Sequence, residues 1–377
     1  MAITRREFFM SAAGASLLAG SPASSNKEKE KIKAKVSNMN NYFALPLQIT
    51  CDALNGLNKK DAKSKMLEKI KTINRQIKAS KAWIGPELKL VVLPEYFLTS
   101  FPMGESINDW KENFAVNKNG DVVKALQEVA KENDIFLSGN LYVKEPSFPK
   151  FYFQSSMIWS PKGKTVLDYV RLNSMFTPTP HDVFDQYVEK YGYDALFPVV
   201  ETEIGALACI ASEEILFPEI ARCLAFKGAE IFLHSSSEVH SRNHSPKRTA
   251  KLARAFENNA FVVSANSAGI SGISIPENST DGGSMIVNYK GQIINEAEQG
   301  ESMTAYSRIE LDSLKKHRSS VSMDNMFARQ RLELYSKSYL DNSVYPVNTL
   351  EKEEPTRKHF KETMLKSIKR LTKRGMI

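Results

Sequence analysis

Short apolar runs alternate with amphipathic helical segments along most of this sequence, and this alternation constrains the fold more than any other feature. Leu88–Leu93 is an apolar run typical of a strand buried inside a protein. The preceding segment, Lys59–Ser80, places Met66, Ile70 and Ile77 at helical spacing. Strands that alternate with helices in this way predict an α/β (α+β) protein in which helices cover the faces of a sheet.

The same patterns predict the remaining elements of the fold. Further strands are expected at Tyr42–Ile49, Ile135–Val143, Phe151–Trp159, Thr165–Leu172, Thr202–Ala211, Glu230–His234, Phe261–Asn266, Ser284–Tyr289 and Gln292–Ala297. Further helices are expected at Val122–Glu132, Ile215–Lys227 and Pro246–Asn258. The turn Ser160–Gly163 between two of the strands predicts a hairpin. Because no Pro- or Gly-rich break divides residues 40–310, one domain is preferred over two.

Composition excludes several classes of function. The chain has 377 residues, of which 42% are hydrophobic, so it can bury a large core, and it contains no uninterrupted apolar run long enough to predict a membrane-spanning helix. The net charge of +8 is concentrated at the two ends, which leaves a slightly acidic body that is poorly suited to nucleic acid. Cys51, Cys209 and Cys223 lack metal-ligand spacing, so no metal or cofactor is predicted.

The N-terminal residues are typical of a signal for export rather than of a folded element. Arg5 and Arg6 are followed by Phe8 and by the Ala/Gly-rich stretch Met10–Gly20. This pattern is that of a twin-arginine signal peptide, with an ordinary amphipathic helix as the alternative. We expect a signal peptide at residues 1–25, a charged linker at 26–40, and a periplasmic or extracellular location.

The C-terminal residues 313–377 are expected to form an extension that contains a basic amphipathic helix. Within His359–Arg374, the side chains of Phe360, Leu365 and Ile368 fall on one helical face, and lysines and arginines cover much of the rest. We prefer a helix docked on its own body or on a sister subunit. A weak contact with a membrane surface is the alternative.

Five segments of the chain carry motifs that occur in a characteristic order. They are Leu88–Phe97, Gly163–Asn173, Ser212–Glu230, Arg254–Asn266 and Asp281–Val287. Together they resemble the carbon–nitrogen hydrolase (nitrilase/amidase) superfamily over roughly residues 40–310, so the expected domain is 41–312. The resemblance implies a four-layer α-β-β-α sandwich, pairing into homodimers or larger assemblies, and hydrolysis of non-peptide carbon–nitrogen bonds in a small substrate.

The resemblance also implies a site built from a Glu base, a Lys, a Cys nucleophile and often a second Glu. A thiolate is a strong nucleophile near neutral pH, the Glu takes its proton, and the Lys stabilises the developing oxyanion. Glu95, at the end of the buried strand, matches the base. Arg171 stands where the family has its Lys. Arg keeps the charge, so a clamp for an anionic group is one interpretation and an ion pair with Glu95 is the other.

The position of the nucleophile is ambiguous in this sequence. Counting back from Pro218 by the family spacing reaches Ser212, whereas counting forward from Gly205 reaches Cys209. We prefer Ser212, which lies where a strand is expected to give way to a helix. Residues three apart on a strand face opposite sides, so the two cannot easily share a pocket. Cys209 can equally be a small core residue, and Ser212 can be a helix cap.

Three further residues are candidates for binding the substrate. Glu214 follows the presumed nucleophile by two positions, and His234 ends a predicted strand close to the site in the family fold. Asp182 lies near the place of the second family Glu, and Val183–Asp194 after it resembles an insertion that could cover the pocket.

These observations predict an exported, amidase-like hydrolase that acts through an acyl-enzyme. Because the Lys and Cys positions are altered, two alternatives remain: a catalytically impaired relative that binds a small amide or carboxylate ligand, and an acyltransferase. Against the acyltransferase, the chain lacks the multi-span membrane part that such relatives carry.

Overall fold

The computed structural model describes residues 39–239 and 245–377, and residues 40–377 form one unit. The strands build two larger sheets and one small pair. The first sheet has the order β15-β1-β3-β5-β6-β7 with β4 beside β5, and the second has the order β14-β13-β11-β10-β9-β8. Parallel neighbours such as β1 and β3, or β9 and β10, lie at the centre of each sheet, and antiparallel hairpins lie toward the edges.

The elements have the following bounds. The first sheet consists of β1 Asn41–Pro46, β3 Leu88–Val92, β4 Val116–Asn117, β5 Phe136–Lys144, β6 Tyr152–Trp159, β7 Thr165–Val170 and β15 Ser307–Glu310. The second consists of β8 Val200–Thr202, β9 Gly205–Ala211, β10 Ile231–Ser235, β11 Phe261–Ala265, β13 Met285–Val287 and β14 Ile293–Glu296, and the small pair is β2 Cys51–Asp52 with β12 Ile270–Ser271. The α-helices are α3 Lys59–Ile84, α4 Ile107–Asn113, α5 Asp121–Glu132, α6 Phe184–Tyr191, α7 Pro218–Phe226, α8 Pro246–Asn258, α9 Leu311–Arg318, α10 Glu333–Asp341 and α11 Arg357–Lys373. Short 3₁₀ turns span Pro180–Val183, Tyr193–Leu196, Ser212–Leu216 and Glu277–Thr280.

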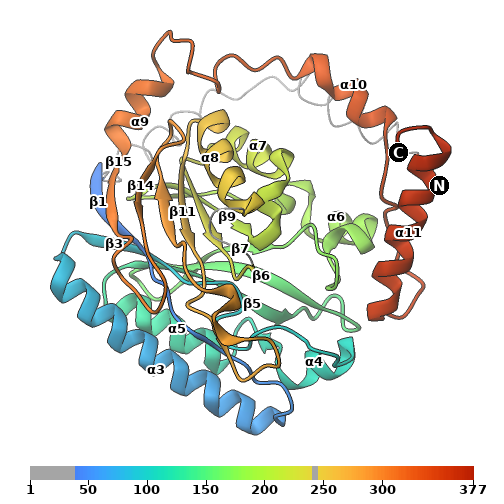
Figure 1. The fold of residues 1–377 in the computed structure, drawn as a ribbon, viewed down its shortest axis with the longest axis horizontal. Coiled ribbons are helices and arrows are strands. Elements are labelled where there is room, and N and C mark those ends of the chain that lie inside the picture. The colour runs from blue at the N-terminus through green and yellow to red at the C-terminus, as the bar shows by residue number, and fades with distance from the viewer. Residues whose placement is uncertain (1–38, 240–244) are drawn as a thin grey trace, which may run out of the picture. The chain divides into compact units, whose positions relative to one another are not determined.

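The alternation of side chains along the central strands explains the layers. On β3, Val91 packs with the buried faces of α3 and α5, whereas Leu90 and Val92 pack against the second sheet. On β9, Leu207 and Cys209 face the first sheet, and Ala208 faces α7 and α8 with the opposite side of the strand. The order is therefore helix, sheet, sheet, helix (Figure 1), and each central strand is apolar on both faces.

The α/β class predicted from the sequence is confirmed, and most elements lie within a few residues of their predicted bounds. The helix Pro246–Asn258 has the predicted bounds, because Ser245 caps its first turn and Asn259 adopts a left-handed conformation at its end. The hairpin at Ser160–Gly163 is also present, between β6 and β7.

Two elements that were predicted to be continuous are interrupted in the structure. The single strand expected at Thr202–Ala211 is a hairpin in which Thr202 pairs with Gly205 across a two-residue turn. The single helix expected at Ile215–Lys227 is a 3₁₀ turn followed by α7, because Phe217 is extended and Pro218 begins a new helix. Both breaks lie beside the segment that carries Ser212.

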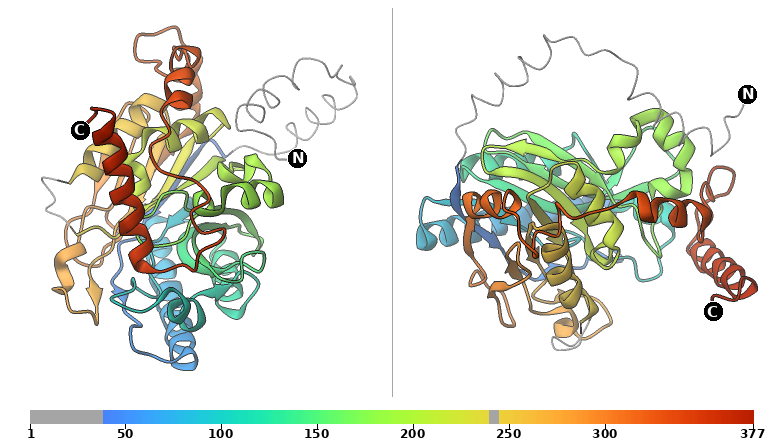
Figure 2. Two further views of the ribbon diagram at one scale, coloured as in Figure 1. Left: turned by 90° about the vertical axis from the view of Figure 1, so that its right-hand side faces the viewer. Right: turned by 90° about the horizontal axis from the view of Figure 1, so that it is seen from above.

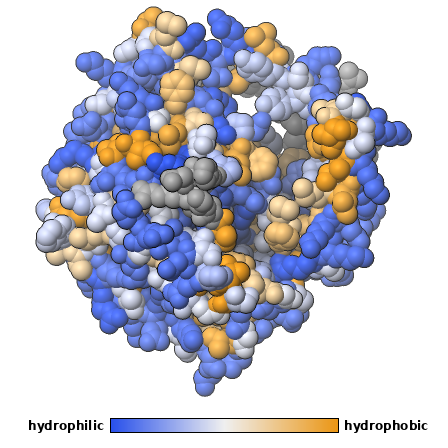
Figure 3. All heavy atoms as spheres, viewed as in Figure 1, coloured by the Kyte–Doolittle hydropathy of each residue, from blue (hydrophilic) through white to orange (hydrophobic). Residues whose placement is uncertain are grey.

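The C-terminal segment extends along one side of the fold, from orange to red in Figures 1 and 2, and ends in α11. Phe360 on α11 is buried in the core cluster of the first sheet, which agrees with a helix docked on its own body. On the same helix, Met364, Leu365 and Ile368 remain exposed by 44%, 56% and 39%, and Figure 3 shows apolar side chains gathered on this side of the molecule. Among the described residues, no helix is both long and apolar enough to span a membrane.

Candidate active site

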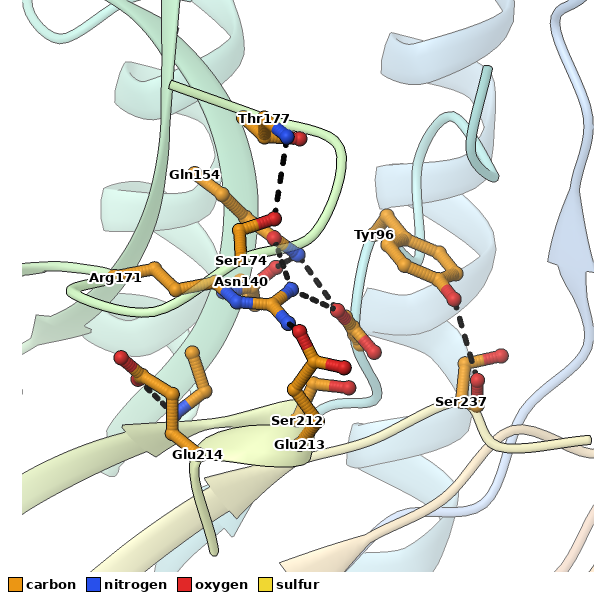
Figure 4. A network of polar contacts seen from close by, with 12 residues as sticks. Tyr96, Asn140, Gln154, Arg171, Ser174, Thr177, Ser212, Glu213, Glu214 and Ser237 are labelled. Carbon is orange, nitrogen blue, oxygen red and sulfur yellow. Dashed lines mark hydrogen bonds and ion pairs between the residues drawn. The ribbon is translucent and has the colours of Figure 1, made fainter. Parts of the chain in front are cut away.

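Side chains from the carboxyl ends of three strands meet in one polar cluster. Glu95 follows β3, Arg171 follows β7, and Ser212 follows β9. Figure 4 shows the Arg171 side chain extending toward Gln154 and Glu213, with Ser212 beside Glu213 at the end of its strand. The carboxyl ends of parallel strands are where α/β sheets hold ligands, so the position of this cluster is that of a binding or catalytic site.

A buried ion pair connects Glu95 and Arg171. The Nη1 of Arg171 donates to the Oε1 of Glu95 over 3.1 Å and to the Oε1 of Gln154 over 2.6 Å. Gln154 in turn donates from Nε2 to the same Glu95 oxygen over 2.8 Å. The Glu95 carboxylate is only 2% exposed, and its second oxygen, Oε2, has no hydrogen-bond partner among the described residues. One oxygen is therefore fixed and the other is available to a ligand or to a water molecule.

Arg171 has little capacity left for a substrate anion. Its Nη2 donates to the Oε1 of Glu213 over 2.5 Å, and its Nε donates to the backbone carbonyl of Asn173 over 2.7 Å. Two carboxylates, from Glu95 and Glu213, thus surround one guanidinium. The net charge of these three ionised groups is negative. The contacts support the interpretation of Arg171 as an ion-pair partner and give no support to a clamp for an anionic group.

Ser212 sits at a strained bend between β9 and the following 3₁₀ turn. Its φ is +51°, a conformation that costs an L-residue roughly 1–2 kcal/mol. The Ser212 hydroxyl accepts a hydrogen bond from the Nζ of Lys247 over 3.1 Å. A residue that is forced into a sharp strand-to-helix bend with a polar partner at its hydroxyl has the geometry of a nucleophile elbow.

His234 stabilises the backbone of this bend through hydrogen bonds within the protein. Its Nε2 donates to the backbone carbonyl of Ser212 over 2.8 Å, and its Nδ1 is 2.8 Å from the hydroxyl of Ser264. Burial, with Lys251 and Lys247 nearby, holds the pKa of His234 well below its ordinary value, so the ring is neutral at pH 7. Both ring nitrogens are occupied, and the contacts favour a positioning role over the predicted substrate contact.

Glu214 is also engaged in structural contacts. Its Oε1 accepts from the backbone N–H groups of Leu172 and Asn173 over 2.7 and 3.0 Å. Its Oε2 accepts from the hydroxyl of Tyr169 over 2.8 Å and from the N–H of Ala211 over 3.2 Å. The carboxylate therefore ties the end of β9 to the end of β7 and sets the distance between Ser212 and Arg171. No contact supports the predicted role of Glu214 in substrate binding.

The two other predicted candidates lie in structural surroundings. The side chain of Cys209 is fully buried between the sheets, 3.7 Å from the hydroxyl of Ser138, and burial raises the pKa of its thiol to about 12. Asp182 accepts hydrogen bonds from the backbone and side chain of Thr179, each over 2.9 Å, and from the hydroxyl of Thr349 over 2.9 Å. These contacts favour a core residue and a capping residue, respectively.

Sequence reasoning missed Gln154, Glu213 and Lys247. Gln154 lies in a strand that also contains Ser155 and Ser156, so the sequence pattern alone does not distinguish it. Glu213 is adjacent to the predicted Glu214, and only the direction of each side chain distinguishes the two. Lys247 lies 35 positions from Ser212, so no local spacing connects them. Among the described residues, no group of His, Cys, Asp and Glu side chains could hold a metal ion.

The fold and this site define a class of protein: two sheets packed between helices, with a serine elbow beside a buried Glu–Arg pair. The family model for carbon-nitrogen hydrolases matches residues 52–319 of the sequence. That range is more than half of the chain, so this protein belongs to the carbon-nitrogen hydrolase family, and the predicted resemblance is confirmed.

Several relatives agree with this assignment. The chain is 26% identical over 252 residues to Nitrilase homolog 2 of Dictyostelium discoideum, which covers 66% of this chain and 72% of that protein. It is 28% identical over 208 residues to a Formamidase of Bacillus cereus (strain Q1), covering 55% of this chain and 58% of the relative. The chain thus spans less than two thirds of that formamidase.

Solved structures of the superfamily have the same fold. A carbon-nitrogen hydrolase from Helicobacter pylori G27 superposes with a TM-score of 0.59 at 19% identity, covering 79% of this chain and 98% of the other. Nit3 of Saccharomyces cerevisiae, described as a nitrilase-superfamily member, superposes with a TM-score of 0.57 at 20% identity, covering 75% and 95%. At these identities the likeness establishes the fold alone.

Proposed function

We propose that this protein is an amidase-like hydrolase that cleaves a carbon–nitrogen bond of a small, neutral substrate through an acyl ester on Ser212. The observation that carries the proposal is the buried Oε2 of Glu95, which has no partner among the described residues and lies in the same polar cluster as the Ser212 elbow. A buried carboxylate oxygen without a hydrogen bond is costly in a folded protein. A substrate or an attacking water would satisfy it.

The proposed chemistry follows the contacts of the site. The Ser212 hydroxyl oxygen attacks the carbonyl carbon of the amide, the carbon–nitrogen bond breaks, and the amine leaves with a proton. Water then attacks the ester, the acid is released, and Ser212 regains its proton. Glu95 is the acid–base group for the attacking water, and Gln154 and Arg171 hold its carboxylate in one orientation.

A neutral substrate is favoured over an anionic one by the charges around Arg171. Glu95 and Glu213 already pair with its guanidinium, so an anion beside Arg171 would meet two carboxylates that compete for the same donors. The relatives include a protein named Formamidase, which is 28% identical over 208 residues. Short neutral amides are therefore the first substrates to test.

Amide turnover tests this proposal. Ammonia release from a panel of short neutral amides is measured with wild type, Glu95→Gln, Ser212→Ala and Cys209→Ala. We expect the Glu95 and Ser212 variants to lose about 100-fold or more of kcat, since each removes a group that acts in the transition state. The Cys209 variant serves as the control for the other candidate nucleophile and should retain most of its turnover.

Two results would contradict the hydrolase proposal. If Cys209→Ala abolishes turnover while Ser212→Ala keeps it, the nucleophile is misassigned. If amides raise the melting temperature of the wild type but neither the wild type nor any variant releases ammonia, the protein is a catalytically impaired relative that binds its ligand. The ion pairs that saturate Arg171 are the observation that favours this second function.

Export through the twin-arginine route and assembly into homo-oligomers remain proposals. The signal lies at residues 1–25, outside the described residues, and its support is the paired Arg5 and Arg6. In a bacterial host with this pathway, replacing both arginines by lysine should leave the protein in the cytoplasmic fraction, as cell fractionation would show. Equal export of both forms would contradict the proposal.

A further inference from the structure

Lys247 is the residue whose side chain contacts the hydroxyl of Ser212, and its position on α8 is well defined. Ser245 caps this helix by accepting from the N–H of Arg248 over 3.2 Å, and Pro246 begins the first turn. Lys247 comes next, and its Nζ lies 3.1 Å from the Ser212 Oγ and 3.4 Å from the Ser236 Oγ. The first turn of α8 thus places the Lys247 Nζ beside the Ser212 hydroxyl.

Glu95 does not occupy this position in the structure. The oxygen of Glu95 that is fixed accepts from Gln154 and Arg171, and no hydrogen bond joins its carboxylate to the Ser212 hydroxyl within residues 39–239 and 245–377. A serine hydroxyl needs a well-aligned base, so another group has to take its proton.

We propose that Lys247 is the general base that activates Ser212, which rests on the proposed function and deepens it. The neutral Lys247 amine takes the hydroxyl proton as the Ser212 oxygen forms its bond to the amide carbonyl carbon. When the carbon–nitrogen bond breaks, the Lys247 ammonium gives that proton to the leaving nitrogen. Water then attacks the ester, with its proton passing to Glu95, and the proton returns to the Ser212 oxygen as the acid leaves. The sum is one amide and one water giving one acid and one amine.

The charges around Lys247 suit this role. On its own helix, Lys251 is 1% exposed and lies 3.8 Å from the Oε1 of Glu238, and Lys247 lies 3.7 Å from the Oε2 of the same carboxylate. Two lysines thus face the Glu238 carboxylate. Burial lowers the pKa of Lys251, Glu238 opposes this, and Lys247 acts in the direction of burial. The electrostatic surroundings of Lys251 also include Glu296 and Arg248, which pair with each other.

An alkyl fluorophosphonate tests this inference without knowledge of the natural substrate, because it reacts with an activated serine and releases fluoride. The full chain is incubated with the probe, the rate of labelling is followed by intact mass, and the site is assigned by peptide mapping. We expect wild type to be labelled on Ser212 and both Lys247→Met and Lys247→Arg to react about 100-fold or more slowly. Lys227→Met, which removes a solvent-exposed lysine paired with Asp194, is the matched control and should react like wild type.

The arginine variant separates a base from a cation that only donates a hydrogen bond. Arginine keeps the charge and the donors but does not lose its proton, so it can replace a donor and cannot replace a base. If Lys247→Arg reacts at the rate of wild type, the inference fails even though the proposed function stands. If wild type hydrolyses amides without labelling on Ser212, the serine mechanism itself fails, and with it the role of Lys247. Because methionine beside Glu238 can destabilise the fold, melting temperatures are measured for each variant. If the methionine variant is unfolded, the arginine variant is the deciding test.

Discussion

Glu214 lies beside the site, and its side chain is fully buried. Burial raises its pKa to about 7, while Arg171, Tyr169 and the N–H groups of Leu172 and Asn173 act in the opposite direction. Since this carboxylate ties β9 to β7, its protonation state affects the contacts that hold the Ser212 elbow near Arg171. At the scale of single residues, the site therefore depends on a group that does not touch a substrate.

The raised pKa of Glu214 predicts how stability depends on pH. A group whose pKa is raised from 4.5 to about 7 in the folded state contributes stability that is fully present below pH 4.5 and is lost as the pH rises to about 7. Relative to Glu214→Gln, whose amide does not titrate, wild type should lose about 3 kcal/mol of unfolding free energy over this interval. Urea denaturation of both proteins at several pH values measures the difference. A difference that stays constant with pH would contradict the prediction.

The residues of the site differ in how well the sequence predicts them. Glu95, Arg171 and Ser212 each follow an apolar run that forms a strand, so the end of the strand marks them. The roles of Arg171 and Glu214 could not be decided in advance, because they depend on which carboxylates face the guanidinium. Lys247 could not be found at all, since its contact with Ser212 exists only after β9 and α8 pack together.

At the scale of elements, the break between β8 and β9 sets the position of the strand that leads to Ser212. Gly205 has a φ of +107°, and Thr202 accepts from the N–H of Ile204 and donates to the carbonyl of Gly205 within the turn. A Cβ on Gly205 would lie 3.0 Å from Glu230 Oε2 and 3.1 Å from Leu311 Cδ1. The sequence pattern missed this turn because Thr202 and Ile204 are both residues that favour strands.

Two glycine variants test the importance of this turn. Gly228 has nearly the same φ, +104°, but nothing lies within 4 Å of its Cβ position. Gly205→Ala and Gly228→Ala should each lose roughly 1–2 kcal/mol of stability from the left-handed backbone, and Gly205→Ala should lose a further 1–3 kcal/mol or so from crowding. Melting temperatures of both variants measure the difference. Equal losses would show that Leu311 can move away from the new Cβ without a loss of stability.

At the scale of the whole molecule, the sequence predicted the architecture better than the chemistry. Strands such as β3 and β9 are apolar on both faces and therefore need packing partners on both faces. A layered α/β fold supplies these partners. The amphipathic pattern of the C-terminal helix favoured docking on its own body, and the burial of Phe360 agrees with this, but the particular contacts could not be read from the sequence. Arg357 reaches the carbonyls of Glu105 and Phe176 and the hydroxyl of Tyr152, contacts that join the extension to the segment after Arg171.

We propose that Ser212 takes the place of the Cys nucleophile that the family resemblance implies, in a chain that also carries Arg171 at the position of the family Lys. Peptide mapping after incubation of the full chain with an activated short-chain acyl ester tests it most directly. We expect one acyl group on Ser212, lost again in the Ser212→Ala variant. An acyl group on Cys209, or no covalent adduct in a protein that turns over amides, would contradict the claim.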